Sequence, residues 1–321
     1  MKRIIIVGCN GQDGTILYDQ LTNKGHAVIG IGRELVKTTG SAPIVSTTID
    51  IGNSPQISSL VAEFQPHEIY YLAAFHHSAE DQVIDEGELF LKSSQINVNY
   101  LIHFLEAIRQ HSRQTRIFYA ASSHIFGAGD GNLQDETTPI SPVCAYGITK
   151  SAGLLACRYY REKHSLFATT GILYNHESRY RSKNFVSQKI IQGAVAIKND
   201  RADKMMLGDL SAEIDWGYAP DYVEAMQCLL EIESPGEFII ATGKSYTVRD
   251  FVKIAFSLLD LDWEKYVYED KKIISKPSII RRGNPQKLMM ATGWNPKTSF
   301  PRMIEELLRD EGAFNCSKPN L

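Results

Sequence analysis

The chain has 321 residues and a formal net charge of -3, with 43% hydrophobic and 22% charged residues. This near-neutral balance lacks the basic field of a general nucleic-acid binder, and no apolar run approaches the roughly 20 residues that a membrane helix needs. The five cysteines are odd in number and never spaced as Cys-x-x-Cys, so we expect neither structural disulfides nor a metal site. The N-terminal apolar run is too short for a signal peptide, which predicts a cytoplasmic protein.

Short β-branched segments alternate with helical patterns in the first half of the chain. The predicted strands are 3–7, 27–31, 43–49, 68–73, 116–120 and 168–173, and the predicted helices are 12–24, 57–64, 96–109 and 146–163. This alternation is typical of a parallel sheet with helices on both faces, that is, a doubly wound α/β fold of the Rossmann type. After about residue 174 the segments become shorter and more polar, and two helices stand out at 221–232 and 248–259. We therefore expect a second, smaller α/β lobe.

A glycine-rich segment joins the first predicted strand to the first predicted helix. Glycine permits a tight turn and close approach of the backbone to a pyrophosphate, and the helix N-terminus offers N–H groups to it. Arg33 comes just after the second predicted strand, 27–31, and favours the 2′-phosphate of NADP. Glu34 comes next, and an acid favours NAD. The pattern predicts NADP as the preferred cofactor, with NAD as the alternative. The predicted loop contacts are Gly8, Asn10, Gly11, Gln12, Asp13 and Gly14.

A Tyr-Lys pair opens the predicted helix 146–163. Tyr146 and Lys150 are four residues apart, so they share a helix face. An ammonium beside a phenol is expected to lower the pKa of the tyrosine. The phenolate then accepts the proton of an alcohol whose carbon gives hydride to nicotinamide. Ser122 and Ser123 follow a predicted strand, where a hydroxyl can bind the same substrate oxygen.

Several longer stretches carry a resemblance to a known family. They are Gly11–Gly14, Gly171–Ser178 with Asn184–Val186, Leu207–Leu210 with Asp215–Ala225, and Gly293–Phe300. Together with the glycine loop, the serines and the Tyr-Lys pair, they resemble the extended short-chain dehydrogenase/reductases that act on nucleotide sugars. Among these, the chain is most similar to the GDP-mannose 4,6-dehydratases. The resemblance implies that hydride leaves C4 of a GDP-linked sugar, water is eliminated across C5 and C6, and hydride returns to C6.

The same resemblance implies an organisation for the chain. Residues 1–173 would form the NAD(P)-binding Rossmann domain, and residues 174–321 the nucleotide-sugar-binding lobe. The boundary is expected to be interleaved, with later segments returning to the first domain. Family members usually dimerise through the helices that correspond to 96–109 and 146–163, so we expect a homodimer with a nucleotide sugar as its ligand.

Matching positions receive roles from the family pattern. Tyr146 would be the base for the sugar 4-hydroxyl, Lys150 would hold the ribose and tune Tyr146, and Ser122 stands where the family has its catalytic Ser or Thr. Further cofactor contacts are predicted for Asp50, Ile51, Leu72, Ala73, Ala74 and His176, beside Arg33. Substrate contacts are predicted for His77, Ser123, Asn175, Glu177, Asn184, Lys276 and Arg281, with Arg282 as a further candidate for the diphosphate.

The chain departs from the dehydratase pattern at one catalytic position. The dehydratases carry a Glu two residues after the catalytic Thr, and this chain carries His124 there. A neutral imidazole also accepts protons near neutral pH, so we retain His124 as a catalytic candidate for the elimination. The replacement leaves a 4-keto-sugar reductase, 4-dehydrogenase or epimerase as alternatives, and a cofactor-binding sensor without turnover as a more remote one. Two segments also differ in length from the family: 34–46 looks shorter, and 75–95 looks longer.

Overall fold

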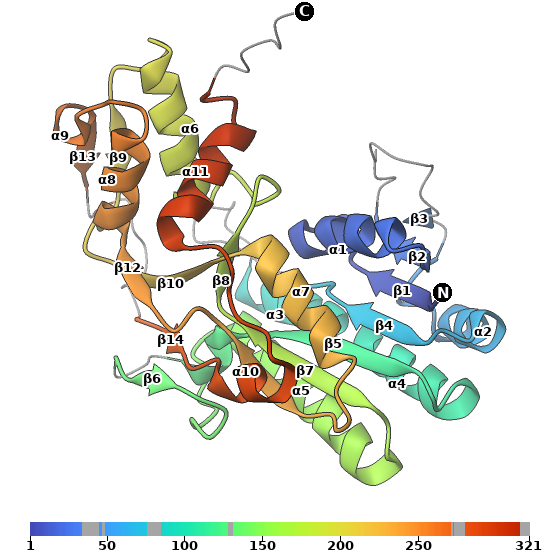
Figure 1. Cartoon of the computed structure of the whole chain (residues 1–321). Coiled ribbons are helices and arrows are strands. Elements are labelled where there is room, and N and C mark those ends of the chain that lie inside the picture. Colours follow the sequence, from blue (N-terminus) through green and yellow to red (C-terminus); the bar gives the residue numbers. More distant parts are fainter. Residues whose placement is uncertain are drawn as a thin grey trace, which may run out of the picture.

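A seven-stranded sheet organises the molecule in the computed structural model (Figure 1). The structure describes residues 1–33, 45–46, 49–75, 85–127, 131–270, 272 and 280–314. The sheet has the order β11-β7-β5-β4-β1-β2-β3, and each pair of neighbours is parallel. The predicted doubly wound fold is therefore confirmed. The strands are β1 (Arg3–Val7), β2 (Ala27–Ile31), β3 (Val45–Ser46), β4 (Glu68–Tyr71), β5 (Arg116–Ser122), β7 (Ala168–Leu173) and β11 (Glu237–Ile240).

The strand order changes direction between β1 and β4. From β1 the chain adds β2 and β3 on one side, and then crosses to add β4, β5 and β7 on the other. At such a switch point, the loops that follow neighbouring strands run to opposite faces and leave a crevice for a ligand. The loop after β1 begins at Gly8 and the loop after β4 begins at Leu72, so the topology places the predicted glycine loop at this crevice.

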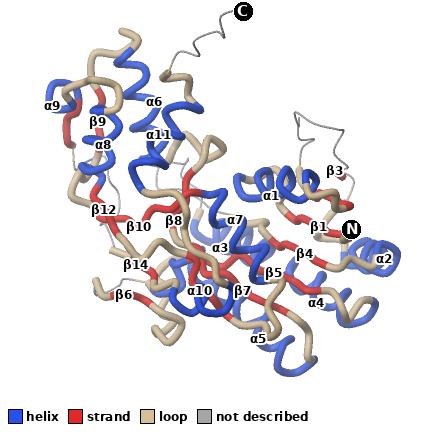
Figure 2. Tube along the Cα trace, viewed as in Figure 1, coloured by secondary structure: helices blue, strands red, loops and turns tan. Residues whose placement is uncertain are grey.

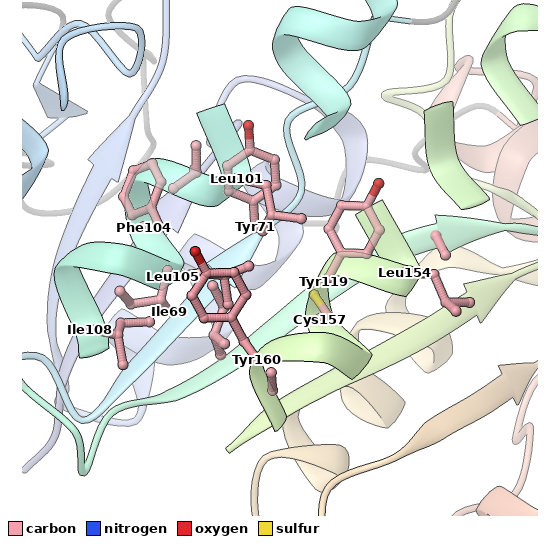
Figure 3. Packing of buried hydrophobic residues seen from close by; sticks show 14 of the residues in the cluster. Ile69, Tyr71, Leu101, Phe104, Leu105, Ile108, Tyr119, Leu154, Cys157 and Tyr160 are labelled. Carbon is pink, nitrogen blue, oxygen red and sulfur yellow. The ribbon is translucent and has the colours of Figure 1, made fainter. Parts of the chain in front are cut away.

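Helices cover both faces of the sheet (Figure 2). Successive strand residues point to opposite faces, so Ile5 and Val7 belong to one apolar cluster while Ile4 and Ile6 belong to another. Figure 3 shows part of the first cluster, in which sheet residues such as Ile69 and Tyr71 meet Phe104 and other helix residues. The helices on that face are α2 (Ser54–Phe64), α4 (Tyr100–His111) and α5 (Ala145–His164). Those on the opposite face are α1 (Gln12–Asn23), α7 (Ala219–Leu229) and α10 (Gln286–Thr292).

A second lobe lies beside the sheet (Figure 1), and its buried apolar residues form a core of their own. The Trp216 ring belongs to this core, where it stacks on Phe300 at 5.5 Å and meets Phe251 edge-on at 5.3 Å between ring centroids. Its strands are β8 (Asn175–Glu177), β9 (Met205–Leu207), β10 (Glu213–Tyr218), β12 (Ser245–Thr247) and β13 (Val267–Glu269). Its helices are α6 (Val186–Lys198), α8 (Val248–Ser257), α9 (Trp263–Tyr266) and α11 (Phe300–Asp310).

Segments from the second half of the chain also lie on the main sheet. Strand β11 pairs with β7, helix α7 packs on α1, and α10 packs on β11. A short pair of strands, β6 (Leu133–Gln134) and β14 (Arg282–Gly283), joins distant parts of the chain. The chain therefore passes between the two lobes more than once, and a ligand between them would contact residues that are far apart in sequence.

Boundaries differ from the predicted ones where local geometry changes. The strand predicted at 68–73 ends at Tyr71, and the one predicted at 43–49 is a strand only at Val45–Ser46 within the described residues. The helix predicted at 96–109 begins with a π-helical turn, η1 (Gln95–Asn99), before α4. Helices α3 (Glu86–Ser94), α6 and α11 were not predicted. No helix in the described ranges is long and apolar enough to cross a membrane.

Candidate active site

A cavity of about 420 Å³ opens beyond the carboxyl ends of β1, β4, β5 and β7. Its wall combines the glycine loop, the residues after β5, the start of α5 and the segment after β7. This is the crevice that the strand order predicts. The predicted site residues that line it are Gly8, Gly11, Gln12, Asp13, Gly14, Leu72, Ala74, Ser122, Ser123, His124, Tyr146, Lys150, Asn175 and His176.

The glycine loop is packed closely against the segment that follows β4. Gly8 has a φ of 91°, a value that residues other than glycine rarely adopt. A Cβ at this position would lie 2.7 Å from the Ala73 backbone nitrogen. A Cβ on Gly14 would collide with the Gly8 carbonyl oxygen. Helix α1 begins after its N-cap residue, Gly11, which has no side chain to cap the first N–H groups of the helix. A helix N-terminus of this kind, facing a cavity, is suited to a diphosphate.

Asp13 and His176 join the glycine loop to the chain after β7. His176 Nε2 lies 2.9 Å and 3.0 Å from the two Asp13 carboxylate oxygens, and Nδ1 lies 2.7 Å from the Tyr174 carbonyl oxygen. A carbonyl and a carboxylate only accept hydrogen bonds, so both ring nitrogens donate and the ring is an imidazolium. Burial opposes both charges. The attraction and hydrogen bond between them outweigh it, raising the pKa of His176 and lowering the pKa of Asp13.

Gln12 provides a second link between the same two segments. Its Nε2 donates to the His176 carbonyl oxygen at 3.0 Å, and its Oε1 accepts from Ser178 Oγ at 3.0 Å. The His176 ring also stacks on Tyr222 of α7, with 4.7 Å between ring centroids. Contacts from α1, β8 and α7 therefore fix the wall of the cavity that carries the imidazolium.

Tyr146 and Lys150 lie on the face of α5 that is turned toward β5. Lys150 is 1% exposed, and its Nζ donates to the Ala120 carbonyl oxygen at 2.6 Å. The same Nζ lies 5.7 Å from the centroid of the Tyr146 ring. The four-residue spacing predicted a shared helix face, and both side chains line the same cavity.

The predicted effect on the Tyr146 pKa is wrong for this structure. Burial raises the pKa of Tyr146 to about 12, against opposing effects of the Arg181 guanidinium and a hydrogen bond with Ser122. Burial also lowers the pKa of Lys150 to about 7. The lysine is therefore a weaker source of positive charge than a solvated ammonium, and Arg181 is the cation that favours the phenolate here.

Ser122 and His124 also line the cavity. Ser122 ends β5, and His124 follows in a short 3-10 helix, η2 (Ser123–Phe126). The His124 backbone N–H donates to Ser122 Oγ at 3.4 Å. The His124 ring meets the Tyr146 ring edge-on, with 5.6 Å between centroids. The structure thus gathers the predicted catalytic residues Ser122, His124, Tyr146 and Lys150 in the same cavity.

Arg181 is a cavity residue to which the sequence analysis assigned no role. Its guanidinium lies 3.7 Å from the centroid of the Phe185 ring, and its Nε lies 3.5 Å from a Glu177 carboxylate oxygen. Glu177 is 2% exposed and also accepts from Ser187 Oγ at 2.6 Å. Glu177 therefore holds Arg181 and does not itself line the cavity. The only sequence signal for Arg181 was its place between two stretches with family resemblance, which end at Ser178 and begin again at Asn184.

Other predicted site residues lie outside the lining of this cavity. Arg33 is exposed after β2, Asp50 Oδ1 accepts the Gly52 N–H at 2.8 Å, and Arg281 Nε donates to the Gly127 carbonyl oxygen at 3.1 Å. His77 and Lys276 fall outside the described residues. The remaining predicted residues that do not line the cavity are Asn10, Ile51, Ala73 and Asn184.

Comparison with known proteins assigns the chain to a family. The family model for GDP-mannose 4,6 dehydratase matches residues 5–307. The chain belongs to the GDP-mannose 4,6-dehydratase family. GDP-mannose 4,6 dehydratase 2 of Arabidopsis thaliana is 31% identical over 97% of this chain and 87% of its own length. GDP-mannose 4,6 dehydratase 2 of Caenorhabditis elegans is 31% identical over 99% of this chain and 91% of its own length. These relatives favour the dehydratase prediction over the reductase, 4-dehydrogenase and epimerase alternatives.

Solved structures share the fold at lower identity. RMD from Pseudomonas aeruginosa, complexed with NADPH, has a TM-score of 0.79 at 18% identity, over 97% of this chain and 98% of its own. The dTDP-glucose 4,6-dehydratase of Bacillus anthracis, in complex with NAD, has a TM-score of 0.80 at 15% identity, over 98% of both chains. These likenesses agree with the parallel sheet and the second lobe described above.

Proposed function

We propose that this chain is an NAD(P)-dependent 4,6-dehydratase of a GDP-linked hexose. The observation that carries the proposal is that Ser122, Tyr146 and Lys150 share a cavity with the glycine loop. The family match over residues 5–307 supports the substrate class and the reaction. In this organisation residues 1–173 hold the cofactor and residues 174–321 the nucleotide sugar, with α7, β11 and α10 returning to the main sheet.

The residues around α1 fit a dinucleotide. Gly11 leaves the helix N-terminus without a side-chain cap, and Gly8 and Gly14 have no room for a Cβ, so the backbone itself forms the surface offered to a diphosphate. Arg33, exposed after β2, supports NADP over NAD, because a guanidinium binds a 2′-phosphate. When bound, the nicotinamide would accept hydride from the sugar and return it. The His176 imidazolium is paired with the Asp13 carboxylate, so this pair fixes the cavity wall without adding net charge to it.

We assign the removal of the proton from the sugar 4-hydroxyl to Tyr146. A general base must lie within hydrogen-bond reach of the proton that it removes, and Tyr146 shares the cavity wall with Ser122, which can bind the same oxygen. Burial raises the pKa of Tyr146, while Arg181 and Ser122 favour its phenolate. These two residues therefore support ionisation of Tyr146 when the 4-hydroxyl gives up its proton.

The elimination step is assigned to His124. It occupies the position of the dehydratase Glu, lines the cavity, and has its ring against Tyr146. An imidazole nitrogen can take the C5 proton and then give it to the departing C6 hydroxyl. A single residue near Tyr146 would thus serve C5 and C6 while Tyr146 serves C4.

A homodimer is part of the proposal. The helices predicted to form its interface, 96–109 and 146–163, correspond to α4 and α5, and the exposed apolar side chains favour α5 together with α3. Helix α5 exposes Ile148, Leu155 and Tyr159 by 40%, 47% and 54%. These residues repeat at helical spacing on one face. The neighbouring α3 exposes Leu91 by 67%, whereas the exposed end of α4 is polar. Exposed apolar side chains that gather on one face mark an interaction surface.

A cytoplasmic location is also proposed. Within the described residues, Cys9, Cys144, Cys157 and Cys228 are free thiols. Free thiols are typical of a reducing compartment. A GDP-linked sugar and a nicotinamide cofactor would be available to the enzyme in the same place.

The direct test is to incubate the purified protein with GDP-mannose and NADP, and to measure the masses of the products by mass spectrometry. The proposal predicts loss of one water from the sugar in the wild type and loss of that activity in His124→Ala. Reduction of an added 4-keto sugar by NADPH, with no dehydrated product from GDP-mannose, would contradict it.

A further inference from the structure

Cys144 connects the start of α5 to the ring of His124. It is the N-cap of α5, its Sγ accepts the Gly147 N–H at 3.4 Å, and the same Sγ lies 3.7 Å from His124 Nδ1. Gly147 also packs against η2, because a Cβ there would lie 2.5 Å from the His124 carbonyl oxygen. The thiol and the imidazole are therefore held together by two tightly packed backbone segments.

The place of the sulfur favours its use as an acceptor. The first N–H groups of a helix have no partner within the helix, and an N-cap side chain accepts from them at the positive end of the helix dipole. A thiol is only a weak donor, whereas an imidazole N–H is a good one. We propose that Cys144 is a positioning residue, whose Sγ accepts a hydrogen bond from His124 Nδ1–H and so keeps the proton-accepting lone pair of the ring on Nε2.

This inference rests on the proposed elimination and gives His124 a defined cycle. Nε2 takes the C5 proton, and the electrons of the C5–H bond form the C5=C6 double bond as the C6–O bond breaks. The same proton passes from Nε2 to the departing hydroxyl, which leaves as water. The imidazole is neutral before and after the step. It is positive in between, while Nδ1–H keeps its hydrogen bond to the sulfur, which orients the ring as the carboxylate orients the histidine of a catalytic triad.

Two substitutions at position 144 separate this role from helix capping. Asp and Gly are both favourable N-cap residues, so Cys144→Asp and Cys144→Gly should both leave α5 intact, which thermal unfolding checks. Asp offers an oxygen that only accepts, and Gly offers no side chain. The difference between the two variants therefore reports the hydrogen bond at Nδ1.

The primary measurement is the nitrogen spectrum of the protein labelled with ¹⁵N-histidine, with the His124 signals assigned by their loss in His124→Gln. We expect the proton on Nδ1 in the wild type and in Cys144→Asp, and a shift toward the Nε2–H tautomer in Cys144→Gly. An Nε2–H tautomer in the wild type, or an unchanged tautomer in Cys144→Gly, would overturn the inference. Neither result depends on turnover.

A kinetic measurement links the tautomer to the chemistry. With GDP-mannose, Cys144→Gly should still oxidise C4, as seen from reduced nicotinamide, but should lose water about 10²-fold more slowly, within the range of a general base. The 4-keto sugar that retains its C6 hydroxyl should accumulate, and Cys144→Asp should lose water faster than Cys144→Gly. Equal rates in the two variants would count against Cys144. If the wild type forms no dehydrated product, the proposed function fails while the tautomer result still stands on its own.

Discussion

His176 Nε2 lies 2.9 Å from the Asp13 carboxylate, across 163 positions of sequence. Asp13 lies in the first turn of α1, beside the glycine loop, and His176 lies in β8 of the second lobe. Because Nδ1 of the same ring is committed to the Tyr174 carbonyl oxygen at 2.7 Å, the contact is an ion pair between two charged groups. It joins the proposed cofactor site to the proposed sugar site.

The coupling energy between Asp13 and His176 should depend on pH. His176 has a raised pKa, so its contribution to stability is fully present below its unfolded value of 6.5 and is lost as the pH rises through the folded pKa. Asp13 has a lowered pKa, so its contribution is present above 3.8 and is lost as the pH falls through the folded pKa. A double-mutant cycle of Asp13→Asn and His176→Gln should give a coupling of about 0.5–3 kcal/mol between pH 3.8 and 6.5. The same cycle in alkaline solution should give a much smaller coupling energy, because His176 loses its proton there. Equal coupling energies in acidic and alkaline solution would rule out the ion pair.

Removing the Tyr146 hydroxyl should reduce turnover far more than cofactor affinity. General acid–base groups contribute about 10²–10⁴-fold, so Tyr146→Phe should lose that much activity on GDP-mannose while calorimetry shows NADP binding close to the wild type. Tyr268→Phe, which changes a 50% exposed tyrosine of β13, is the matched control and should keep full activity. Near-normal rates in Tyr146→Phe would exclude the tyrosine as the base.

Lys150 should make the folded state less stable at neutral pH than a neutral side chain would. Burial lowers the pKa of Lys150 from 10.5 to about 7, so the unfolded chain binds more protons than the folded chain between these values. Stability from this group therefore rises with pH across that range. The free energy of unfolding of Lys150→Met should exceed that of the wild type most at low pH, and the difference should shrink as the pH approaches 10.5. A difference that is constant with pH would contradict the lowered pKa.

The sequence predicted the first half of the fold and most of the cavity wall for a physical reason. Strands 3–7 and 27–31 are short β-branched runs, and their identity depends on local pattern alone. Tyr146 and Lys150 share a helix face because of their spacing, so their common placement was predictable. The sequence also placed the glycine loop at the end of the first strand.

Other features depend on contacts between distant segments. The shift of the Tyr146 pKa was predicted in the wrong direction. The four-residue spacing of Tyr146 and Lys150 does not show how deeply the tyrosine hydroxyl is buried. The role of Arg181 depends on Glu177 and Phe185, which hold its guanidinium beside the cavity. Likewise, the contact between Cys144 and His124 arises because α5 packs on η2, and no pattern within either segment indicates it.

The proposed dimer face can be disrupted at one residue. Leu155→Glu places a charge on the exposed face of α5, where Leu155 is 47% exposed, so it should cost little stability in the monomer. Sedimentation should show a dimer for the wild type and a monomer for the variant. Leu258→Glu, at a leucine that is 37% exposed beyond α8, is the control and should remain dimeric. A monomeric wild type would refute the interface.

The central claim is that one cavity oxidises C4, eliminates water across C5 and C6, and completes the reaction at C6 of the same sugar. GDP-mannose carrying deuterium at C4 tests it most directly, with catalytic NADP and analysis of the product by mass spectrometry and NMR. We expect a 4-keto-6-deoxy sugar whose methyl group carries the deuterium, with no net reduction of the cofactor. A 4-keto sugar that keeps its C6 hydroxyl, formed together with an equal amount of reduced cofactor, would contradict the account.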